Sequence, residues 1–491
     1  MGRPAGPVVA VDVGTSAVRA AVVAADGTVT GAARVSRAGG VGGEHFDAEQ
    51  LWADVCEALG RAVATAGPVV PVALGIAGHI GSVALDADLR PVGPAGGWAD
   101  TRGTDLVAGL PGPLLDRVRE TSGRPVPGAG WLAHALHLQV RYPDRAARVR
   151  ALVSPKDFLL ARCVGEPVTD TVDAAYSLVF DVRRGRWDHA LLAELGVGPG
   201  WWPRVVAPGA PVAGLLPGVA AVTGLPAGLP VVGGGPDGSV GVGLLLGDRT
   251  DLVADVAGTT DVLGRVHDSP AAAGPGALLN PGLRAGRWVS GGPTGLTGGA
   301  VLRWRELTGG TGHTTGRAAD EAAVEALAPG ADGLLVVPTM SGDRFPGWRP
   351  GTRGAVLGQT PGHGPAHLVR AAQEGAAFTV REGVELLDDG RAAGPRPVVL
   401  AGGAARSEAA ARLRADVFGR RVLACADPDV TLLGAAALAM AGAGCDLDEA
   451  AGRLRPRLRV VEPDPARAAR YDELYVEWLD ARERLVPGTG G

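Results

Sequence analysis

The chain has 491 residues, 46% of them hydrophobic, and a formal net charge of −5 at pH 7. This length is sufficient for two or three domains whose cores need no covalent cross-links. The slightly acidic balance argues against the basic surface of a nucleic-acid-binding protein. The 78 glycines follow no Gly-X-Y period, which excludes collagen.

Nearly all the positive charge is arginine, because the chain contains a single lysine, Lys156. A Walker A loop requires Gly-Lys-Ser/Thr, whereas this lysine lies in Ser-Pro-Lys-Asp. The strand lysine and His-Arg-Asp loop of the usual protein kinases are missing too. A nucleotide would therefore have to be held by backbone N–H groups, hydroxyls, arginine and a metal ion.

Cysteine spacing and the length of apolar runs indicate the cellular compartment of the protein. The four cysteines form no Cys-x-x-Cys pair, so neither a zinc site nor a disulfide framework is indicated. Residues 1–8 do not resemble a secretory signal, and the longest apolar run, 432–444, is too short to span a membrane. These features predict a soluble, cytoplasmic protein without nucleic-acid or membrane partners.

The first clear element is a predicted hairpin at residues 8–23, with Gly14, Thr15 and Ser16 in its turn. Successive N–H groups in such a turn can bind an anion, and the two hydroxyls add donors. Asp12 could hold a phosphate-bound Mg²⁺, and Arg19 could reach the same phosphates. The alternative is an ordinary hairpin whose polar side chains satisfy the turn.

The middle of the chain predicts mixed α/β structure. Strands are expected at 72–76, 82–86 and 229–232, and helices at 131–142 and 238–246. Asp237 lies at the last strand-to-helix turn, a suitable position for a base that takes a proton from a hydroxyl. The alternatives are a plain N-cap aspartate, or a dinucleotide fingerprint at Gly233-x-Gly235-x-x-Gly238 with Asp251 or Asp255 binding the ribose.

A second hairpin with a Gly258-Thr259-Thr260 turn begins about half a chain after the first. The repetition suggests two similar domains that share a cleft, with a junction near 247–249. A strand, Gly turn and helix recur at 398–407, where Ser407 is placed to cap the helix. The tail at 463–485 predicts an amphipathic helix that packs on its own domain or joins a homodimer.

These patterns together resemble the FGGY family of carbohydrate kinases, most of all its xylulokinase branch. The resemblance runs from residue 8 to about 444, through a set of short motifs in family order. Each motif alone is unspecific, but the ordered set is strongly specific. They are the D-x-G-T-S-x-x-R run at 12–19, then 85–86, 98–102, 156–181, 255–260, 342–346, 353–358, 370–375, 402–407, 415–419 and 433–436.

The resemblance implies an α/β fold of two actin-like (ribonuclease H-like) domains, 1–248 and 249–491, that close over an ATP and sugar cleft. It implies ATP-dependent phosphorylation of a small sugar, with a pentulose such as D-xylulose as the leading candidate and a place in xylose metabolism. Asp237 would be the general base, and Asp12 would help hold Mg²⁺. ATP would be bound by Asp12, Gly14, Thr15, Ser16, Arg19, Gly258, Thr259, Thr260, Gly402, Gly403 and Ser407.

The sequence departs from the family where the sugar is recognised. Xylulokinases usually carry Gln-Met-His-Gly in the stretch occupied here by 79–82, so the sugar-contacting His is replaced by Gly81, which should leave room. His79 either contacts substrate instead or is a satisfied pocket-wall histidine, and the Asp100–Arg102 pair either binds sugar or supports the wall. The candidate substrate residues are His79, Ile80, Gly81, Trp98, Asp100, Arg102 and Asp237.

Three classes of function follow from these observations. The leading one is a kinase of a ketose or polyol. The second is a catalytically degenerate ATP- or sugar-binding regulator of the same fold, suggested by the altered sugar motif. The third is the dinucleotide-dependent oxidoreductase that the Gly233–Gly238 fingerprint would indicate.

Overall fold

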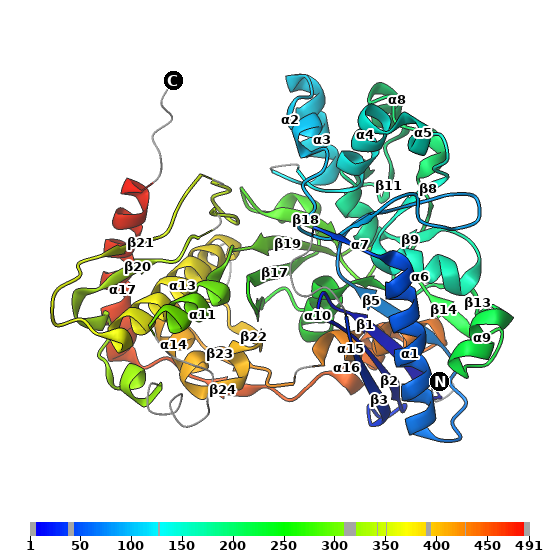
Figure 1. The fold of residues 1–491 in the computed structure, drawn as a ribbon. Coiled ribbons are helices and arrows are strands. Elements are labelled where there is room, and N and C mark those ends of the chain that lie inside the picture. Colours follow the sequence, from blue (N-terminus) through cyan, green and yellow to red (C-terminus); the bar gives the residue numbers. More distant parts are fainter. Residues whose placement is uncertain are drawn as a thin grey trace.

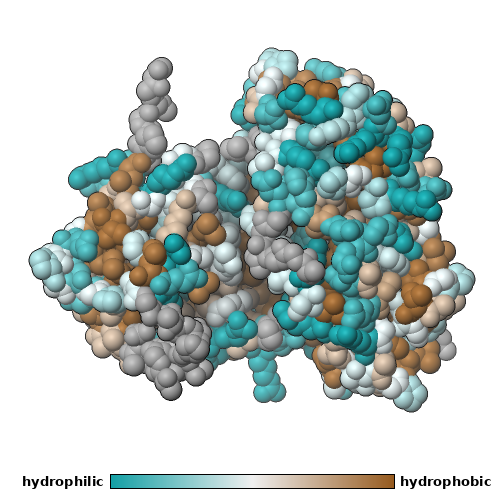
Figure 2. Space-filling view, viewed as in Figure 1, coloured by the Kyte–Doolittle hydropathy of each residue, from teal (hydrophilic) through white to brown (hydrophobic). Residues whose placement is uncertain are grey.

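A computed structural model describes residues 6–37, 44–125, 128–308, 321–340, 342–349, 351–388, 394–427 and 429–485. Two seven-stranded sheets form the centres of two lobes (Figure 1). The molecular surface is hollowed between the lobes (Figure 2). The sequence predicts that the turns at 14–16 and 258–260, which follow the first strand of each sheet, face this cleft.

The first sheet is built on a buried strand, β1 (Val8–Val13), whose six residues are all inaccessible to solvent. This strand runs antiparallel to β2 and parallel to β5. A run of small β-branched and alanine side chains suits a strand covered on both faces. The strand order is β13 (Pro211–Gly214), β14 (Pro230–Val232), β5 (Leu74–Gly78), β1, β2 (Ala17–Val23), β3 (Val29–Ser36), and β15 (Gly235–Pro236) also pairs with β5.

The second sheet repeats this plan. Its first strand, β16 (Val253–Ala257), is antiparallel to β17 and parallel to β22, as β1 is to β2 and β5. Six strands of one sheet correspond to six of the other, which confirms the two similar domains that the repeated Gly-Thr turn predicts. The order is β18 (Leu278–Pro281), β19 (Trp288–Pro293), β17 (Asp261–His267), β16, β22 (Val398–Gly402), β23 (Val422–Ala424), β24 (Arg459–Val461).

Two helices between the sheets each pack on the sheet that belongs to the other half of the chain. Helix α10 (Asp237–Leu246) follows the strands of the first sheet but packs on β16 and β17 of the second. Helix α15 (Val430–Gly442) comes from the second half but covers β1 and β5. A Cβ on Gly434 would lie 2.6 Å from Val240 Cγ1, so the two helices cross in close contact. The boundary at 248/249 stays a prediction, and these helices join the two sides of it.

The outer faces carry the remaining helices of the sheets. Helix α1 (Ala48–Ala66) covers β2 and β3 and is capped by Asp47, whose carboxylate accepts from the N–H groups of Glu49 and Gln50. On the second sheet lie α13 (Pro365–Leu387) and α14 (Glu408–Phe418), and α17 (Pro465–Arg484) packs on these two helices. Helix α11 (Thr297–Leu307) packs on α13, and α16 (Leu447–Leu454) packs on α15.

The tail helix α17 is folded onto its own domain. Tyr471 and Trp478 are fully buried, and the Trp478 ring lies 5.8 Å from that of Phe378 on α13. Apolar residues repeated every three to four positions produce this one-sided contact. Of the two predicted alternatives, packing on its own domain is the one that the structure contains.

A smaller subdomain, residues 79–206, extends the first lobe beside the cleft and has its own core around Trp131 and Trp187. Its strands are β6 (Val83–Leu85), β7 (Ala95–Gly96), β8 (Ala151–Val153), β9 (Val168–Asp170), β10 (Phe180–Asp181), β11 (Arg186–Trp187) and β12 (Arg204–Val206). Its helices are α2 (Thr104–Ala108), α3 (Gly112–Ser122), α4 (Trp131–Arg141), α5 (Pro143–Ala146), α7 (Thr171–Ala174) and α8 (His189–Glu194), whereas α6 (Pro155–Val164) packs on β5, β13 and β14 of the first sheet. Elsewhere lie β4 (His45–Phe46), α9 (Pro217–Thr223), β20 (Leu335–Val337) and β21 (Ala355–Leu357).

The elements predicted in the middle of the chain are present, with their ends shifted by no more than two residues. The helix predicted at 238–246 begins one residue earlier, at Asp237, so this aspartate is the first helical residue. Among the described residues, none of the helices combines the length and apolar character that crossing a bilayer requires.

Candidate active site

The first Gly-Thr-Ser turn connects β1 and β2 at the edge of the cleft. The N–H of Gly14 donates to the Ala17 carbonyl at 3.0 Å, and Arg37 donates to the Gly14 carbonyl at 2.9 Å. Ser16 is exposed, and Gly14 and Thr15 are partly exposed. The turn is therefore held from behind while its outer face is open to a ligand.

The second turn occupies the equivalent position between β16 and β17. Gly258 and Thr259 are exposed. The first turn of α11 packs directly behind them, since Gly299 N–H donates to the Thr259 carbonyl at 2.9 Å and a Cβ on Gly298 would lie 2.1 Å from Gly258 O. Only glycine permits this approach, which supports the turn from beneath.

The predicted adenosine element adjoins that second turn. Gly402 ends β22 with a φ of 81°, and the Gly403 N–H donates to the Ala257 carbonyl at 2.7 Å. Ser407 caps α14 by accepting from the Ala410 N–H at 3.2 Å, which confirms its predicted capping role. An adenosine contact from Gly402, Gly403 or Ser407 stays a prediction.

Asp237 begins α10, directly after β15 has paired with the end of β5. Pro236 occupies the N-cap position, so the alternative of a plain N-cap aspartate is wrong. Burial, together with the nearby negative charge of Asp12, raises the pKa of Asp237 to about 6, although the Gly238 N–H at 2.6 Å opposes the shift. A carboxylate with this pKa is largely ionised at neutral pH and more basic than an ordinary aspartate.

Asp12 lies on β1, opposite Arg19 on β2. The Arg19 guanidinium pairs with the Asp12 carboxylate and also donates to Asp429 Oδ1 at 2.7 Å. Burial raises the pKa of Asp12, and Arg19 opposes that shift. In this structure Arg19 therefore orients Asp12 and joins the two halves of the chain, and its predicted contact with phosphate stays a prediction.

The carboxylate of Asp12 fits a magnesium role. It is a hard oxygen ligand beside the exposed turn at 14–16, and Asp237 and Asp429 add negative charge around it. Mg²⁺ in phosphate-transferring sites is typically held by one or two carboxylates, water and the substrate phosphates. One protein carboxylate at this place is compatible with such a site.

A pocket in the first lobe is lined by most of the residues that the sequence predicts for the sugar site. Of the seven predicted substrate residues, five line one pocket, joined there by residues that the sequence did not indicate. The lining is Ile80, Gly81, Ser82, Gly97, Trp98, Asp100, Arg102, Ala129, Gly130 and Tyr176.

Tyr176 connects this pocket to the carboxylate of α10. Its hydroxyl is hydrogen-bonded to Ser239, two residues after Asp237, and its ring lies 4.6 Å from the Arg124 guanidinium. Sequence reasoning missed it because an isolated Tyr after Asp173-Ala174-Ala175 carries no motif. The contact places the predicted base helix against the predicted sugar wall.

His79 does not line the pocket. It is 4% exposed, its Nε2 lies 3.0 Å from Arg37 Nη1, and its Nδ1 lies 3.1 Å from the Ile80 carbonyl. Its ring meets Phe46 edge to face at 5.4 Å. Burial lowers the pKa of His79 to about 4. Of the two predicted alternatives, the structure favours a satisfied wall histidine, and the substrate role for His79 is not supported.

Asp100 and Arg102 form a close ion pair inside the pocket. Arg102 Nε and Nη2 donate to the carboxylate at 2.9 and 2.7 Å. Although burial acts to raise it, these bonds hold the pKa of Asp100 below its usual value. The pair supports the wall and also lines the pocket, so the two predicted alternatives are compatible.

The expectation that Gly81 leaves room is wrong. A Cβ at this position would lie 2.2 Å from the Gly96 carbonyl oxygen, and Trp131 Nε1 donates to the Gly81 carbonyl at 3.0 Å. The adjacent Ser82 Oγ instead lies 2.8 Å from Nδ1 of His134, a buried histidine that the sequence did not indicate. Burial lowers the pKa of His134 to about 3, so it is neutral.

A residue of the second half reaches this pocket across the cleft. The Arg344 guanidinium lies 5.8 Å from the centre of the Trp98 ring, and Trp98 is 40% exposed. A cation over an indole face is an attractive contact. Arg344 belongs to a segment that resembles the family, but only the tertiary structure brings it to the pocket.

The dinucleotide alternative is contradicted. Gly235 belongs to a short strand, β15, that pairs with β5, and α10 does not lead to a ribose-binding acid. Asp255 is fully buried and accepts from Arg414 at 2.5 Å, while Asp251 is paired with Arg249. Asp255 is therefore inaccessible to a ribose, and Asp251 is engaged by Arg249.

Comparison with known proteins agrees with this architecture. Residues 7–243 match the N-terminal domain, and residues 253–443 the C-terminal domain, of the FGGY family of carbohydrate kinases. In structure the chain is similar to the ligand-bound xylulose kinase from Lactobacillus acidophilus, with a TM-score of 0.89, 21% identity, and coverage of 98% of this chain and 99% of that one. This likeness confirms the fold class of two actin-like domains.

Sequence relatives carry several substrate names. The chain is 29% identical to the xylulose kinase of Escherichia coli (strain K12), over 98% of this chain and 99% of the relative. It is 31% identical to the glycerol kinase of Thermus brockianus (89% and 88%) and 26% identical to the gluconokinase of Bacillus licheniformis (74% and 72%). The chain belongs to the FGGY family of carbohydrate kinases, phosphotransferases that use an alcohol group as acceptor.

Proposed function

We propose that this enzyme phosphorylates a hydroxyl of a small sugar with Mg-ATP, and that Asp237 is the general base. The leading substrate is a pentulose such as D-xylulose, because xylulose kinases match over nearly the whole chain. The observation that carries the proposal is the Asp237 carboxylate at the start of α10, whose pKa is raised to about 6 by burial and by the charge of Asp12, on the helix whose Ser239 bonds the pocket residue Tyr176.

The chemistry requires little beyond positioning and charge stabilisation. Asp237 accepts the proton of the sugar hydroxyl while the hydroxyl oxygen forms a bond to the γ-phosphorus of ATP. The bond from that phosphorus to the β,γ-bridging oxygen breaks, and ADP leaves. Turns 14–16 and 258–260 would bind the phosphates through N–H groups and hydroxyls, and Mg²⁺, held on the protein side by Asp12, would neutralise phosphate charge.

The pocket lining bears on which substrate the enzyme accepts. The pocket carries Trp98 with Arg344 over it and the Asp100–Arg102 pair, so both an apolar face and charged groups are available. A neutral ketose would use the aromatic face and the carboxylate, whereas an aldonate such as gluconate would be favoured by the two arginines.

A coupled ADP-release assay over pentuloses, hexuloses, pentitols, glycerol and gluconate would test the function. We expect Mg-dependent ADP formation with one substrate class and loss of turnover in Asp237→Ala, with ATP binding retained. Sugar-dependent activity in Asp237→Ala would show that the base assignment is wrong.

The second candidate is a binding protein that has lost catalysis, and the altered 79–82 segment is the observation that favours it. Tight binding of sugar or ATP by calorimetry, with no turnover over the whole panel, would support it against the kinase. A matched control for Asp237→Ala is Asp251→Ala, which removes an exposed carboxylate that is paired with Arg249 and should leave turnover unchanged.

A further inference from the structure

The single lysine of the chain lies in the interior, one residue into α6. Lys156 is fully buried, and its Nζ donates to the Gly233 carbonyl at 2.6 Å, to Asp170 Oδ2 at 2.7 Å and to Asp157. Asp173 Oδ2 lies 3.3 Å away. A lysine ammonium has three protons, so these three bonds use all of its donors.

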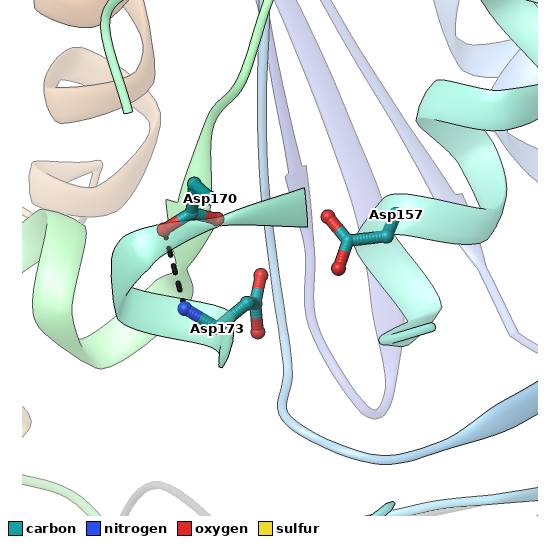
Figure 3. Close-up of side chains that lie close together, drawn as sticks. All are labelled: Asp157, Asp170 and Asp173. Atoms are coloured by element: carbon teal, nitrogen blue, oxygen red, sulfur yellow. Dashed lines mark hydrogen bonds between the residues drawn. The ribbon is translucent and has the colours of Figure 1, made fainter. Parts of the chain in front are cut away.

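The three aspartates come from separate elements and converge on one point, Asp157 from α6, Asp170 from the end of β9 and Asp173 from α7 (Figure 3). Their oxygens are close enough together for metal ligation. The ammonium of Lys156 already lies among them and supplies the positive charge. Although burial alone would lower it, the carboxylates raise the pKa of Lys156, so this group is a permanent internal cation.

Gly233, the fourth partner of Lys156, connects this cluster to the segment that carries Asp237. Gly233 and Gly234 join β14 to β15, and Asp237 follows β15 directly. The position of the carboxylate therefore depends on where this turn lies. The Gly233 carbonyl is fixed from one side by Lys156, and the Gly233 and Gly234 N–H groups donate to the Ala210 and Pro208 carbonyls at 3.1 and 2.8 Å.

The aliphatic stem of Lys156 also packs against the turn. Gly234 has a φ of 76°, and a Cβ there would lie 2.0 Å from the Ile76 carbonyl oxygen and 3.0 Å from Lys156 Cδ. A Cβ on Gly78, at the end of β5, would lie 3.1 Å from Lys156 Cβ. The turn is therefore in close contact with strand β5 on one side and with the lysine stem on the other.

We propose that Lys156 is a positioning residue for phosphoryl transfer: its ammonium, anchored by three aspartates, holds the Gly233 carbonyl and thereby sets the place of the Asp237 carboxylate. The inference rests on the proposed function of Asp237 as the base. Lys156 is fully buried and outside the pocket lining, so it acts only through the turn.

The test variant is Lys156→Met, which keeps an unbranched stem and removes the ammonium. Its matched control is Arg370→Met, which also removes a buried cation, since Arg370 donates to Glu374 at 2.9 Å and to the Tyr471 hydroxyl at 2.6 Å in the other lobe. Both variants lose a buried charge partner, but only the first loses the bond to the Gly233 turn.

Activity is measured per folded molecule, with the sugar that gives turnover in the screen. A displacement of a reacting group by about 1 Å can cost about 100-fold in rate. We expect a loss of kcat of about this size in Lys156→Met, a sugar Kd unchanged by calorimetry, and a shifted acid limb in the pH profile. In Arg370→Met, kcat and the pH profile should be retained. Equal kcat values for Lys156→Met and wild type would overturn the inference.

A measurement on the wild-type enzyme covers the case in which Lys156→Met does not fold. Because the chain has one lysine, ¹⁵N-lysine labelling yields a single side-chain signal. We expect an ammonium signal protected from exchange with water and still protonated at a pH of about 10, where an exposed lysine titrates. A signal that exchanges rapidly and titrates like an exposed lysine would overturn the inference.

The two proposals can fail separately. An active Asp237→Ala enzyme removes the base assignment, and with it the reaction role of Lys156, while the protected lysine signal would still be observed. An inactive Asp237→Ala together with a fully active Lys156→Met removes only the role of the lysine.

Discussion

Arg19 and Asp429 are 410 positions apart in the chain, yet their side chains form an ion pair of 2.7 Å that joins the two halves of the chain. The same guanidinium holds the buried carboxylate of Asp12. Arg19 is thus shared between a carboxylate in the predicted metal site and one at the start of α15. The Arg19–Asp12 pair is more buried than the Arg19–Asp429 pair, so the two ion pairs should contribute differently to stability.

We expect Asp429→Asn to change stability by less than about 1 kcal/mol, because both partners of this pair are partly exposed and screened by water. Arg19→Met should cost more, about 1–3 kcal/mol, since it leaves the buried Asp12 without its partner. Urea denaturation of both variants measures the difference. Equal losses would contradict the assignment of Asp12 as the dominant partner.

The acid limb of activity should belong to Asp237. Its pKa is about 6 and the base must be ionised, so kcat/KM should be constant above that pH and fall tenfold per unit below it. Burial lowers the pKa values of His79 and His134 to about 4 and 3, so neither histidine titrates in this range. A pH–rate profile and NMR titration of the histidines check this, and titration of His79 or His134 near pH 6 would contradict it.

The raised pKa of Asp237 also predicts a stability effect. The folded protein holds the proton more tightly than the unfolded chain, so the contribution of this group is largest below its unfolded pKa and is lost as the pH rises through about 6. Asp237→Asn should therefore be inactive but more stable than wild type at pH 8, by about 1–2 kcal/mol. Thermal unfolding at pH 8 and pH 5 measures this, with a smaller difference expected at pH 5.

Gly81 should not tolerate a side chain. A Cβ would meet the Gly96 carbonyl oxygen at 2.2 Å, so we expect Gly81→Ala to lose about 1–3 kcal/mol and to raise the KM for the sugar. Gly112→Ala is the control, because a Cβ there meets no atom within 4 Å. Restoring the family histidine by Gly81→His should impair the enzyme further, and a gain of activity in that variant would disprove this explanation.

The contact between Trp98 and Arg344 should matter for the sugar rather than for ATP. Trp98→Ala and Arg344→Gln each remove one side of the contact between the pocket residue Trp98 and a residue of the second half. We expect each to raise the KM for the sugar by about 10-fold while the KM for ATP stays unchanged. Arg353→Gln, in a neighbouring segment outside the pocket lining, serves as the control.

The sequence by itself determined the parts whose signals are local. The two Gly-Thr hairpins, the strand-to-helix turn before Asp237 and the Ser407 cap depend on residues a few positions apart, and all are present. The order of the short motifs identified the family. Five of the seven substrate residues predicted from these motifs line one pocket, because their segments pack together in this fold.

Only the tertiary structure decided which of these residues are available for chemistry. His79 is removed from the pocket lining by Phe46 and Arg37, Gly81 is closed in by Gly96, and Lys156 gathers three aspartates around a glycine carbonyl 77 positions away. The exchange of α10 and α15 between the sheets is equally invisible in the sequence. Hydrophobic periodicity records which face of an element is buried, but it does not record the partner, and at these positions the partner sets the charge, the space and the pKa.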